Sequence, residues 1–218
     1  MQKLGFRIPD GAPLRVLCLG AHCDDIEIGC GGTILELAKS HPSLEIHWVV
    51  FGSTPVRAAE AKACAAMFLR GLEHTNVVIR SHRDGFFPAE WVAIKEYFEE
   101  IKKEFEPDVV FTHYRDDRHQ DHRVLSDLAW NTFRNHMILE YEVPKYDGDL
   151  GVPNFFVPLS PESSAAKVKY VLDAFHSQST KHWLTEDTLT ALLRLRGIES
   201  GGTARHAEAF YCRKVILG

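Results

Sequence analysis

Polar side chains that could hold a metal ion occur in two short segments of this chain, AHCDD at 21–25 and RHQDH at 118–122. In the first segment His22 and Asp25 are three residues apart, so one turn can direct both side chains to the same point. A neutral imidazole and a carboxylate are ordinary zinc ligands. Asp24 would then point elsewhere along the turn and be free to act on a metal-bound water. The alternative for this segment alone is that its residues cap the following helix and bond to turn amides.

The second segment places His119 and His122 three residues apart at the expected start of a helix, hence on one face. Asp121 lies between them and could orient an imidazole through its second ring nitrogen, which is a common arrangement around metal ligands. Taken alone, two histidines on a polar helix start are more often solvated than functional. The two segments therefore have to be judged together.

The elements that position these segments alternate between strand and helix. Short apolar runs predict strands at 14–20, 45–52, 76–79 and 108–113, and helical spacing of apolar residues predicts helices at 29–40, 55–71 and 88–106. This order is typical of an α/β fold with a mostly parallel sheet and helices on both faces. The 218 residues are expected to form one domain, 1–218.

The last third of the chain reads differently. Residues 140–161 contain four prolines and predict an irregular segment with a short strand at NFFVPL (154–159). Helices are expected over roughly 162–176 and 187–196, and AEAFYCRKVIL (207–217) is expected to form an edge strand. We expect the irregular segment to form a wall over the ligand pocket and to influence substrate choice.

Ligands of such sheets collect beyond the carboxyl ends of the strands, and both polar segments follow predicted strands at that edge. We therefore expect the two segments to face one another, with His22, Asp25 and His122 as metal ligands and one position open for water or substrate. Asp24 would serve as general base toward a metal-activated water. His119, held by Asp121, would stabilise the oxyanion or protonate the leaving amine.

The residues also resemble a known family. AHCDDIEIGCGGT (21–33) is similar to the AHPDD-x-x-x-G-x-GGT motif of PIG-L/LmbE-like N-deacetylases, and RHQDH resembles their H-x-D-H motif. The RAAE helix and the closing AEAF also look like family features, so the resemblance spans most of the chain. It implies a Rossmann-like fold and removal of N-acetyl groups from glucosamine-type conjugates. The family's ligands, base and oxyanion-side histidine fall on the residues assigned above, and the resemblance is what separates Asp24 as base from Asp25 as ligand.

One position departs from the family motif, because Cys23 stands where the family usually has proline. Proline restricts the turn, so its loss could loosen the positions of His22 and Asp24. Three interpretations are open for this thiol: a bystander, which we favour, an oxidation-sensitive group, or an additional ligand.

Two further residues are candidates for substrate binding. Arg57 resembles a family arginine that contacts substrate, although it could equally be a solvated residue of a first helical turn. Asp84, in the loop RDG, could hydrogen-bond sugar hydroxyls, although aspartate before glycine is also common turn chemistry. The glycines 29, 31 and 32 do not match a nucleotide-binding motif and are expected to bring the backbone close to the metal loop and open the helix.

Composition excludes several function classes. The net charge of −5 and the scattered basic residues argue against nucleic acid as a partner, and no apolar run is long enough for membrane insertion. Five cysteines without a C-x-x-C pair, and no evident signal peptide, favour a cytoplasmic location. The expected substrate is a small amino-sugar conjugate or a nucleotide sugar, and the sequence leaves a homo-oligomer open.

The expected cofactor is Zn²⁺, although Fe²⁺ would fit the same ligands. Two other functions compete with a deacetylase. Loops rich in Asp and His also build two-metal phosphoesterases, and a non-catalytic Rossmann-like binding module would not need Asp24.

Overall fold

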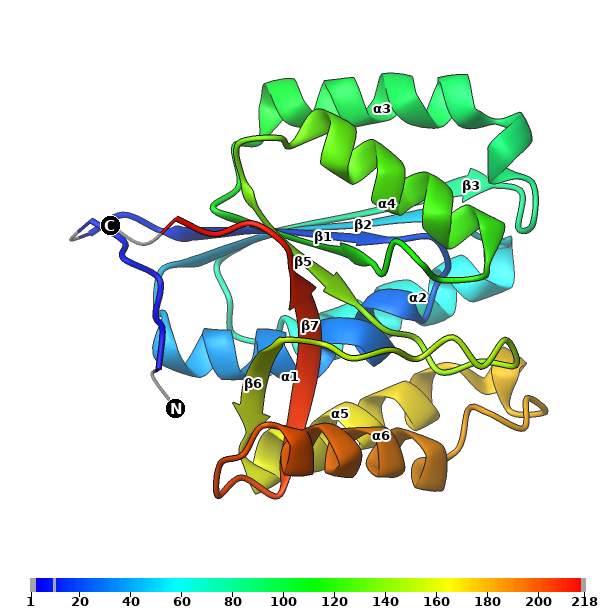
Figure 1. The fold of residues 1–218 in the computed structure, drawn as a ribbon. Helices are drawn as coiled ribbons and strands as arrows, with labels where there is room; N and C mark the ends of the chain where they lie inside the picture. The colour runs from blue at the N-terminus through cyan, green and yellow to red at the C-terminus, as the bar shows by residue number, and fades with distance from the viewer. Residues whose placement is uncertain (1–2, 10, 217–218) are drawn as a thin grey trace.

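The structure is a computed structural model that describes residues 3–9 and 11–216, and its strands form one seven-stranded sheet (Figure 1). The strand order is β3-β2-β1-β4-β5-β7-β6, in which the first five are parallel and β7 is antiparallel to both of its neighbours. The strands are β1 (Leu14–Gly20), β2 (Leu44–Gly52), β3 (His74–His82), β4 (Val109–His113), β5 (Met137–Tyr141), β6 (Phe155–Leu159) and β7 (His206–Cys212). The expected α/β fold with a mostly parallel sheet is confirmed.

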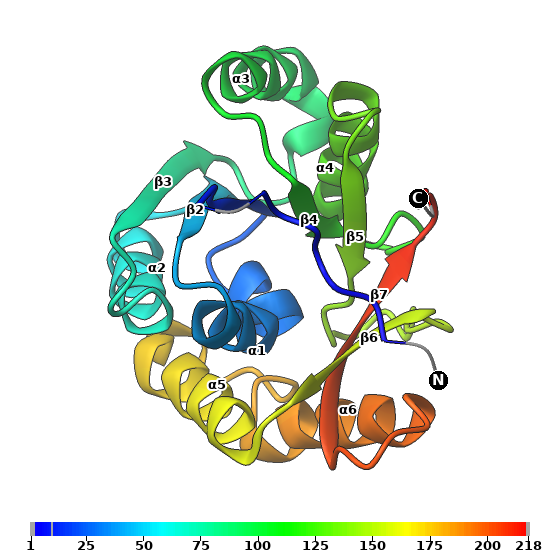
Figure 2. The same cartoon turned by 90° about the vertical axis from the view of Figure 1, so that its left-hand side faces the viewer.

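Helices cover both faces of this sheet. Those of the described residues are α1 (Asp25–Ser40), α2 (Pro55–Phe68), α3 (Trp91–Glu104), α4 (Gln120–Thr132), α5 (Pro161–Ala174) and α6 (Glu186–Glu199), with short 3₁₀ turns at Phe87–Ala89 and His176–Gln178. Figures 1 and 2 show α3 and α4 on one side and α1 and α2 on the other, with α5 and α6 beyond them. Over residues 3–9 and 11–216, none of these helices has the length and apolar character needed to cross a membrane.

The central strands are apolar on both faces because both faces are covered. In β1, Val16 and Cys18 pack into the cluster on the α1 side, whereas Leu17 and Leu19 pack into the cluster under α3 and α4. Successive side chains of a strand point to opposite faces, so a continuous apolar run is what a strand between two helical layers requires.

Helix α1 begins at Asp25, four residues earlier than predicted, and the glycines lie inside it. They permit close packing and do not open the helix as expected. A Cβ on Gly29 would lie 2.1 Å from the Tyr141 ring of β5, and one on Gly32 would lie 2.9 Å from Oε1 of Glu208. The sheet curls around α1 (Figure 2), which brings these side chains against the helix.

One strand was missed, and the predicted edge position of another was wrong. Residues 137–141 form β5, which was not predicted, because Glu140 interrupts an otherwise short apolar run. Its buried carboxylate is satisfied by Trp130 Nε1 at 2.7 Å and Arg213 Nε at 2.8 Å. The last strand is shorter than predicted and lies between β5 and β6, so β6 is the edge and β7 is not; residue 217 of the prediction lies outside the described residues.

Smaller differences concern helix ends. The predicted helix 88–106 divides into the 3₁₀ turn Phe87–Ala89 and α3, which starts at Trp91.

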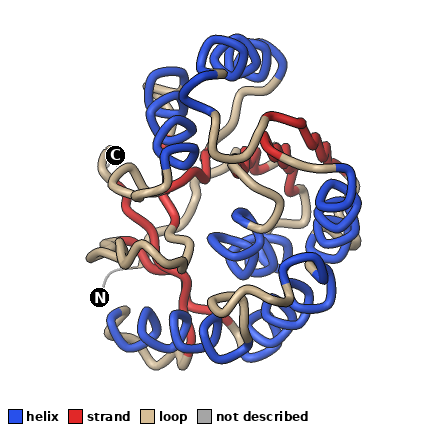
Figure 3. Tube along the Cα trace, turned by 90° about the vertical axis from the view of Figure 1, so that its right-hand side faces the viewer, coloured by secondary structure: helices blue, strands red, loops and turns tan. Residues whose placement is uncertain are grey.

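Figure 3 views the molecule from the side on which the parallel strands end, where the loops that follow β1, β2, β3, β4 and β5 come together.

Candidate metal centre

The loop between β1 and α1 fixes the relative positions of His22 and Asp25. The Asp25 carboxylate accepts the backbone N–H of His22 through Oδ2 at 2.6 Å. The loop is tied to the end of β2, where the N–H of Gly52 donates to the Ala21 carbonyl at 2.8 Å. Because Asp25 is the first residue of α1, its negative charge lies where the helix dipole stabilises it. Both side chains are buried.

The loop between β4 and α4 presents His122. Asp117 accepts the N–H of His119 through Oδ1 at 2.8 Å, and Nδ1 of His119, the N-cap residue of α4, accepts the N–H of Asp121 at 3.3 Å. These bonds satisfy donors at the helix start that have no partner within the helix. His122 thereby lies in the first turn of α4, and it is 2% exposed.

The structure brings His22, Asp25 and His122 together. Nε2 of His122 lies 3.2 Å from Nδ1 of His22, and Oδ2 of Asp25 lies 3.4 Å from that His22 nitrogen and 3.5 Å from that His122 nitrogen. Ligand atoms of a tetrahedral zinc site, each at about 2.0–2.2 Å from the ion, are about 3.3–3.6 Å apart. The three atoms are therefore spaced as one face of such a site.

The second ring nitrogen of each of these histidines contacts a carboxylate. Nε2 of His22 lies 3.2 Å from Oδ2 of Asp121, and Nδ1 of His122 lies 2.9 Å from Oδ2 of Asp117. The carboxylates place the ring protons on those nitrogens, so the two nitrogens that face each other carry lone pairs. When both rings are neutral, two lone pairs and the Asp25 oxygen converge, and this arrangement favours a cation at their centre, either a proton on His22 or a metal ion. The donors fit a divalent metal ion.

The pKa values of these groups follow from the same contacts. Burial lowers the pKa of His22, but Asp121 and Asp25 outweigh it and raise this pKa well above 6.5. Burial and the neighbouring His113 lower the pKa of His122 to about 4. Although burial opposes it, His122 and His113 hold the pKa of Asp25 well below its usual value. In the metal-free chain these pKa shifts favour protonated His22, ionised Asp25 and neutral His122.

The donor groups found among the described residues divide the three donors between two sets: one joins His22 and His122 with His119, and another joins Asp25 and His122 with His113. Nε2 of His113 lies 3.3 Å from Oδ2 of Asp25, but it accepts the N–H of Ala21 at 2.9 Å, so its lone pair is already used. The His119 ring lies 4.8 Å from the His22 ring, between centroids, and is half-buried. His113 is therefore a poorer ligand than His22 or His122.

The Asp24 carboxylate contacts α2 and is in none of the donor groups found among the described residues. Nη2 of Arg57 donates to its Oδ1 at 2.8 Å, whereas Oδ2 is buried and has no hydrogen-bond partner among the described residues. Burial raises the pKa of Asp24, and the Arg57 cation acts against that rise. Arg57 was expected to contact substrate, and in the structure its guanidinium forms a hydrogen bond with Asp24, the expected base.

Asp121 is positioned differently from the prediction, which had it hold His119. Its two carboxylate oxygens accept the N–H groups of Gly85 at 2.6 Å and Phe87 at 3.1 Å, in the loop before α3. These amides draw the carboxylate away from its own helix and toward His22. His119 is held instead by the Asp121 backbone.

Asp84 lies next to the same cluster. Its Oδ1 is 3.1 Å from Nε2 of His22, and its side chain is 63% exposed. The contact with His22 lowers the pKa of Asp84 to about 2. An exposed, ionised carboxylate at this point can contact a substrate that reaches the donors.

Cys23 is fully buried, with its Sγ 3.5 Å from the Gly52 carbonyl. Burial raises the pKa of this thiol to about 12, so it stays protonated at neutral pH. It is in none of the donor groups found among residues 3–9 and 11–216. This geometry agrees with a bystander.

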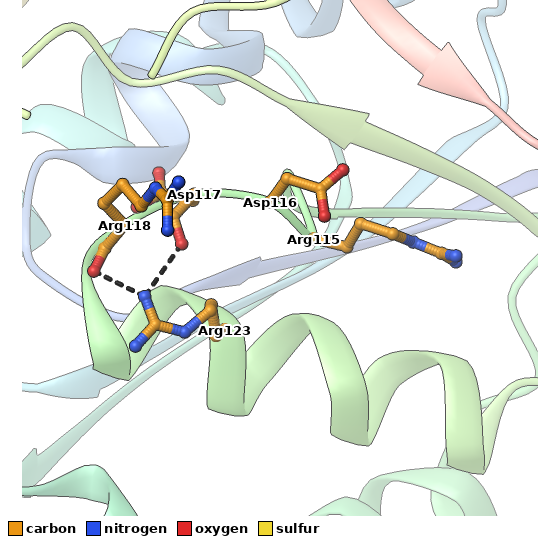
Figure 4. Close-up of a pocket in the computed structure, with 5 residues that line it drawn as sticks. All are labelled: Arg115, Asp116, Asp117, Arg118 and Arg123. Atoms are coloured by element: carbon orange, nitrogen blue, oxygen red, sulfur yellow. Dashed lines mark hydrogen bonds between the residues drawn. The ribbon is translucent and has the colours of Figure 1, made fainter. Parts of the chain in front are cut away.

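Asp117 was not identified from the sequence, although RDDRHQDH places it two residues before His119. Figure 4 shows its loop, where Nη1 of Arg123 donates to the carbonyl of Asp117 at 3.0 Å and also to that of Arg118. The cavity drawn there is lined by this loop and Arg123 and by none of the three donors. An acidic residue close to a pair of histidines was the available signal.

Comparison with protein families gives one match. The model of the PIG-L family, described as GlcNAc-PI de-N-acetylase, matches residues 17–133 of this chain. The matched segment runs from β1 into the residue that follows α4, so it contains both loops of the metal centre.

Solved structures with a similar fold include three whose alignments cover nearly the whole chain. The conserved protein TT1542 of Thermus thermophilus has a TM-score of 0.72 and 22% identity, with 94% of this chain and 97% of that one covered. The N,N′-diacetylchitobiose deacetylase of Pyrococcus horikoshii has a TM-score of 0.68 and 22% identity, with 90% and 82% covered. GalB, the 4-carboxy-2-hydroxymuconate hydratase of Pseudomonas putida, has a TM-score of 0.71 and 15% identity, with 94% of this chain and 98% of that one covered. At these identities the likeness concerns the fold, and one fold serves different reactions.

Proposed function

This chain belongs to the PIG-L family, and from that premise we propose that it is a metal-dependent hydrolase that removes the N-acetyl group of an N-acetylated amino sugar or its conjugate. The observation that carries the proposal is the convergence of two imidazole nitrogens and one carboxylate oxygen at 3.2–3.5 Å. Asp24, which precedes the ligand Asp25 in the chain, has a buried Oδ2 with no hydrogen-bond partner among the described residues. A cation site with a free carboxylate base is one arrangement that can hydrolyse an unactivated amide.

His22, Asp25 and His122 would hold the ion through Nδ1, Oδ2 and Nε2. When bound, zinc or ferrous iron supplies a Lewis acid that polarises the amide carbonyl and makes water more acidic. Asp121 and Asp117 keep the two imidazoles in the tautomers that present lone pairs to the ion.

Asp24 acts as the general base in this proposal. Arg57 occupies its Oδ1, so Oδ2 is the atom that takes the proton from the water attacking the amide carbon. The hydrogen bond from Arg57 also fixes the orientation of the carboxylate, which a base in a buried site needs.

His119 acts on the other side of the reacting amide. Because its Nδ1 accepts the Asp121 N–H, the ring proton of the neutral imidazole lies on Nε2. That N–H can donate to the developing oxyanion or to the leaving amine. Burial and the neighbouring His22 lower the pKa of His119, which favours this neutral form at pH 7.

The substrate class we propose is a small amino-sugar conjugate or a nucleotide sugar. Asp84 would accept hydrogen bonds from sugar hydroxyls, and the loop between β5 and β6 would contact the group attached to the sugar. The proposal treats residues 1–218 as one catalytic domain. A cytoplasmic location remains part of it, supported by the five free cysteines.

A two-metal phosphoesterase is less well supported. A second donor group combines His22, Asp84, His119 and Asp121, but Asp121 already accepts two backbone N–H groups, and Nε2 of His22 faces its carboxylate. A second ion would have to displace these bonds. Elemental analysis separates the cases, because the deacetylase proposal expects about one metal ion per chain.

The decisive experiment measures acetate release from a panel of GlcNAc conjugates and nucleotide sugars, with the protein loaded with zinc or iron and after chelation. We expect release only from the loaded protein. Full activity after verified removal of the metal would contradict the proposal.

A further inference from the structure

The loop between β5 and β6, residues 142–154 (the wall loop), is joined to the metal centre by a buried ionic contact. Nζ of Lys145 lies 2.9 Å from Oδ2 of Asp117 and 2.8 Å and 2.6 Å from the two oxygens of Asp149. The three side chains are at most 9% exposed. An ion pair this well shielded is screened by solvent far less than a surface pair.

Asp117 is the point at which this contact meets the proposed ligand. The oxygen that Lys145 contacts, Oδ2, is the same oxygen that holds Nδ1 of His122, at 2.9 Å from each. Its other oxygen accepts the N–H of His119. One carboxylate therefore sets the positions of both histidines of the RHQDH segment, and a residue of the wall loop sets the position of that carboxylate.

Asp149 completes the connection from the side of the loop. It accepts the backbone N–H of Arg118 through Oδ2 at 2.7 Å, one residue beyond Asp117. Lys145 and Asp149 thus hold the β4–α4 loop at two successive residues, one by its side chain and one by its backbone. Residue 147, which lies between them, is exposed, as are its two neighbours.

The wall loop has a second anchor that does not touch the metal centre. Glu142 accepts bonds from the N–H of Gly151 at 2.9 Å and from Tyr211 Oη at 2.7 Å through Oε1, and from Arg196 through Oε2. These residues tie the loop to α6 and β7. Because the loop has two anchors, a variant at Glu142 can loosen the loop without removing the contact between Lys145 and Asp117. The effect of loop mobility can therefore be distinguished from the effect of losing that contact.

We propose that Lys145, paired with Asp149, is a positioning residue that couples the wall loop to the metal ligand His122 through Asp117. The inference deepens the proposed function and rests on it, because it takes His122 as a ligand. The coupling is reciprocal: if the loop contact strengthens metal binding, the bound metal stabilises the loop by the same factor. A substrate that contacts the wall loop would then also tighten the site that acts on it.

The test titrates the metal-free protein with Zn²⁺ in competition with a chromophoric chelator, without substrate. Lys145→Met is expected to weaken zinc binding by about 10-fold, the lower end of the effect of residues that orient metal ligands. Lys145→Arg, which keeps the charge, should restore most of the affinity. Glu142→Gln, which loosens the same loop at its other anchor, should bind zinc like the wild type. Should Lys145→Met not fold, Asp149→Asn takes its place.

Hydrogen exchange of residues 143–150, with and without Zn²⁺, provides the second readout. Zinc should slow exchange there in the wild type and in Glu142→Gln, and should have no effect on it in Lys145→Met. Equal zinc affinities of Lys145→Met and the wild type would overturn the coupling and leave the proposed function standing. An equal loss of zinc affinity in Glu142→Gln and Lys145→Met would also overturn the coupling, because it would show that any loosening of the loop has the same effect. A wild-type chain that takes up no divalent ion would overturn both proposals.

Discussion

Nε2 of His122 lies 3.2 Å from Nδ1 of His22, although the two residues are 100 positions apart in the chain. In the neutral form each ring presents a lone pair to the other, because a carboxylate holds the opposite nitrogen of each. Such a pair is stable with a proton or a metal ion between the rings. This relationship leads to the first prediction.

Zinc should stabilise the folded protein, and His122→Ala should abolish the effect. A ligand that binds only the folded state at about 100 times its Kd raises the free energy of unfolding by about 2.7 kcal/mol. Thermal unfolding of the metal-free and zinc-loaded proteins measures this effect. His74→Ala, at an exposed position of β3, is the matched control. A zinc-induced rise in Tm that persists in His122→Ala would rule out the proposed ligand.

Asp24→Asn should lower kcat by about 10²–10⁴ while the bound metal is retained, because the variant removes the proton acceptor and no ligand. Steady-state acetate release and elemental analysis of the same sample measure both quantities. Asp173→Asn on α5, where the carboxylate is half exposed, is the control. Loss of the metal together with activity would instead make Asp24 a ligand.

Asp117→Asn and Asp121→Asn should each weaken zinc binding by about 10–100-fold, because each removes the carboxylate that fixes a ligand tautomer. Competition with a chelator measures the dissociation constants. Asp116→Asn changes the neighbouring carboxylate, which is 67% exposed and contacts neither histidine, so it should bind zinc normally. If only Asp121→Asn had an effect, Asp117 would be no more than a helix cap.

His47 should make the stability of the fold depend on pH. It is buried in β2, and burial lowers its pKa below the usual 6.5, although Glu104 and Glu45 oppose this. As the pH falls below 6.5, the unfolded chain takes up a proton that the folded chain does not, so stability is full above that pH and declines toward the folded pKa. Urea unfolding between about pH 5 and about pH 7.5 should show a shallower decline for His47→Gln than for the wild type. Identical slopes would contradict the assignment.

Strands β1, β2 and β4 were predictable because they are buried on both faces and therefore read as largely unbroken apolar runs. β5 was missed because a glutamate occupies a buried position, where Arg115 and Arg213 pair with its charge and Trp130 donates a hydrogen bond to it. The position of β7 between β5 and β6 could not be predicted from the sequence either. An apolar strand with both edges paired has the same pattern as one with a single neighbour.

The sequence by itself determined which donor types are available: His22 and Asp25 lie in one turn and His122 lies in another. It also determined that both turns belong to the same edge of the sheet. Residues close in the chain must share a turn, and parallel strands must end on the same side, so local spacing was sufficient for that much. Tertiary structure alone decided that Asp117 holds His122, that Asp121 holds His22, that Arg57 lies on Asp24 and that Lys145 reaches Asp117. Those pairings depend on how separate loops and helices meet, and their partners are set by strand order and by how the helices pack.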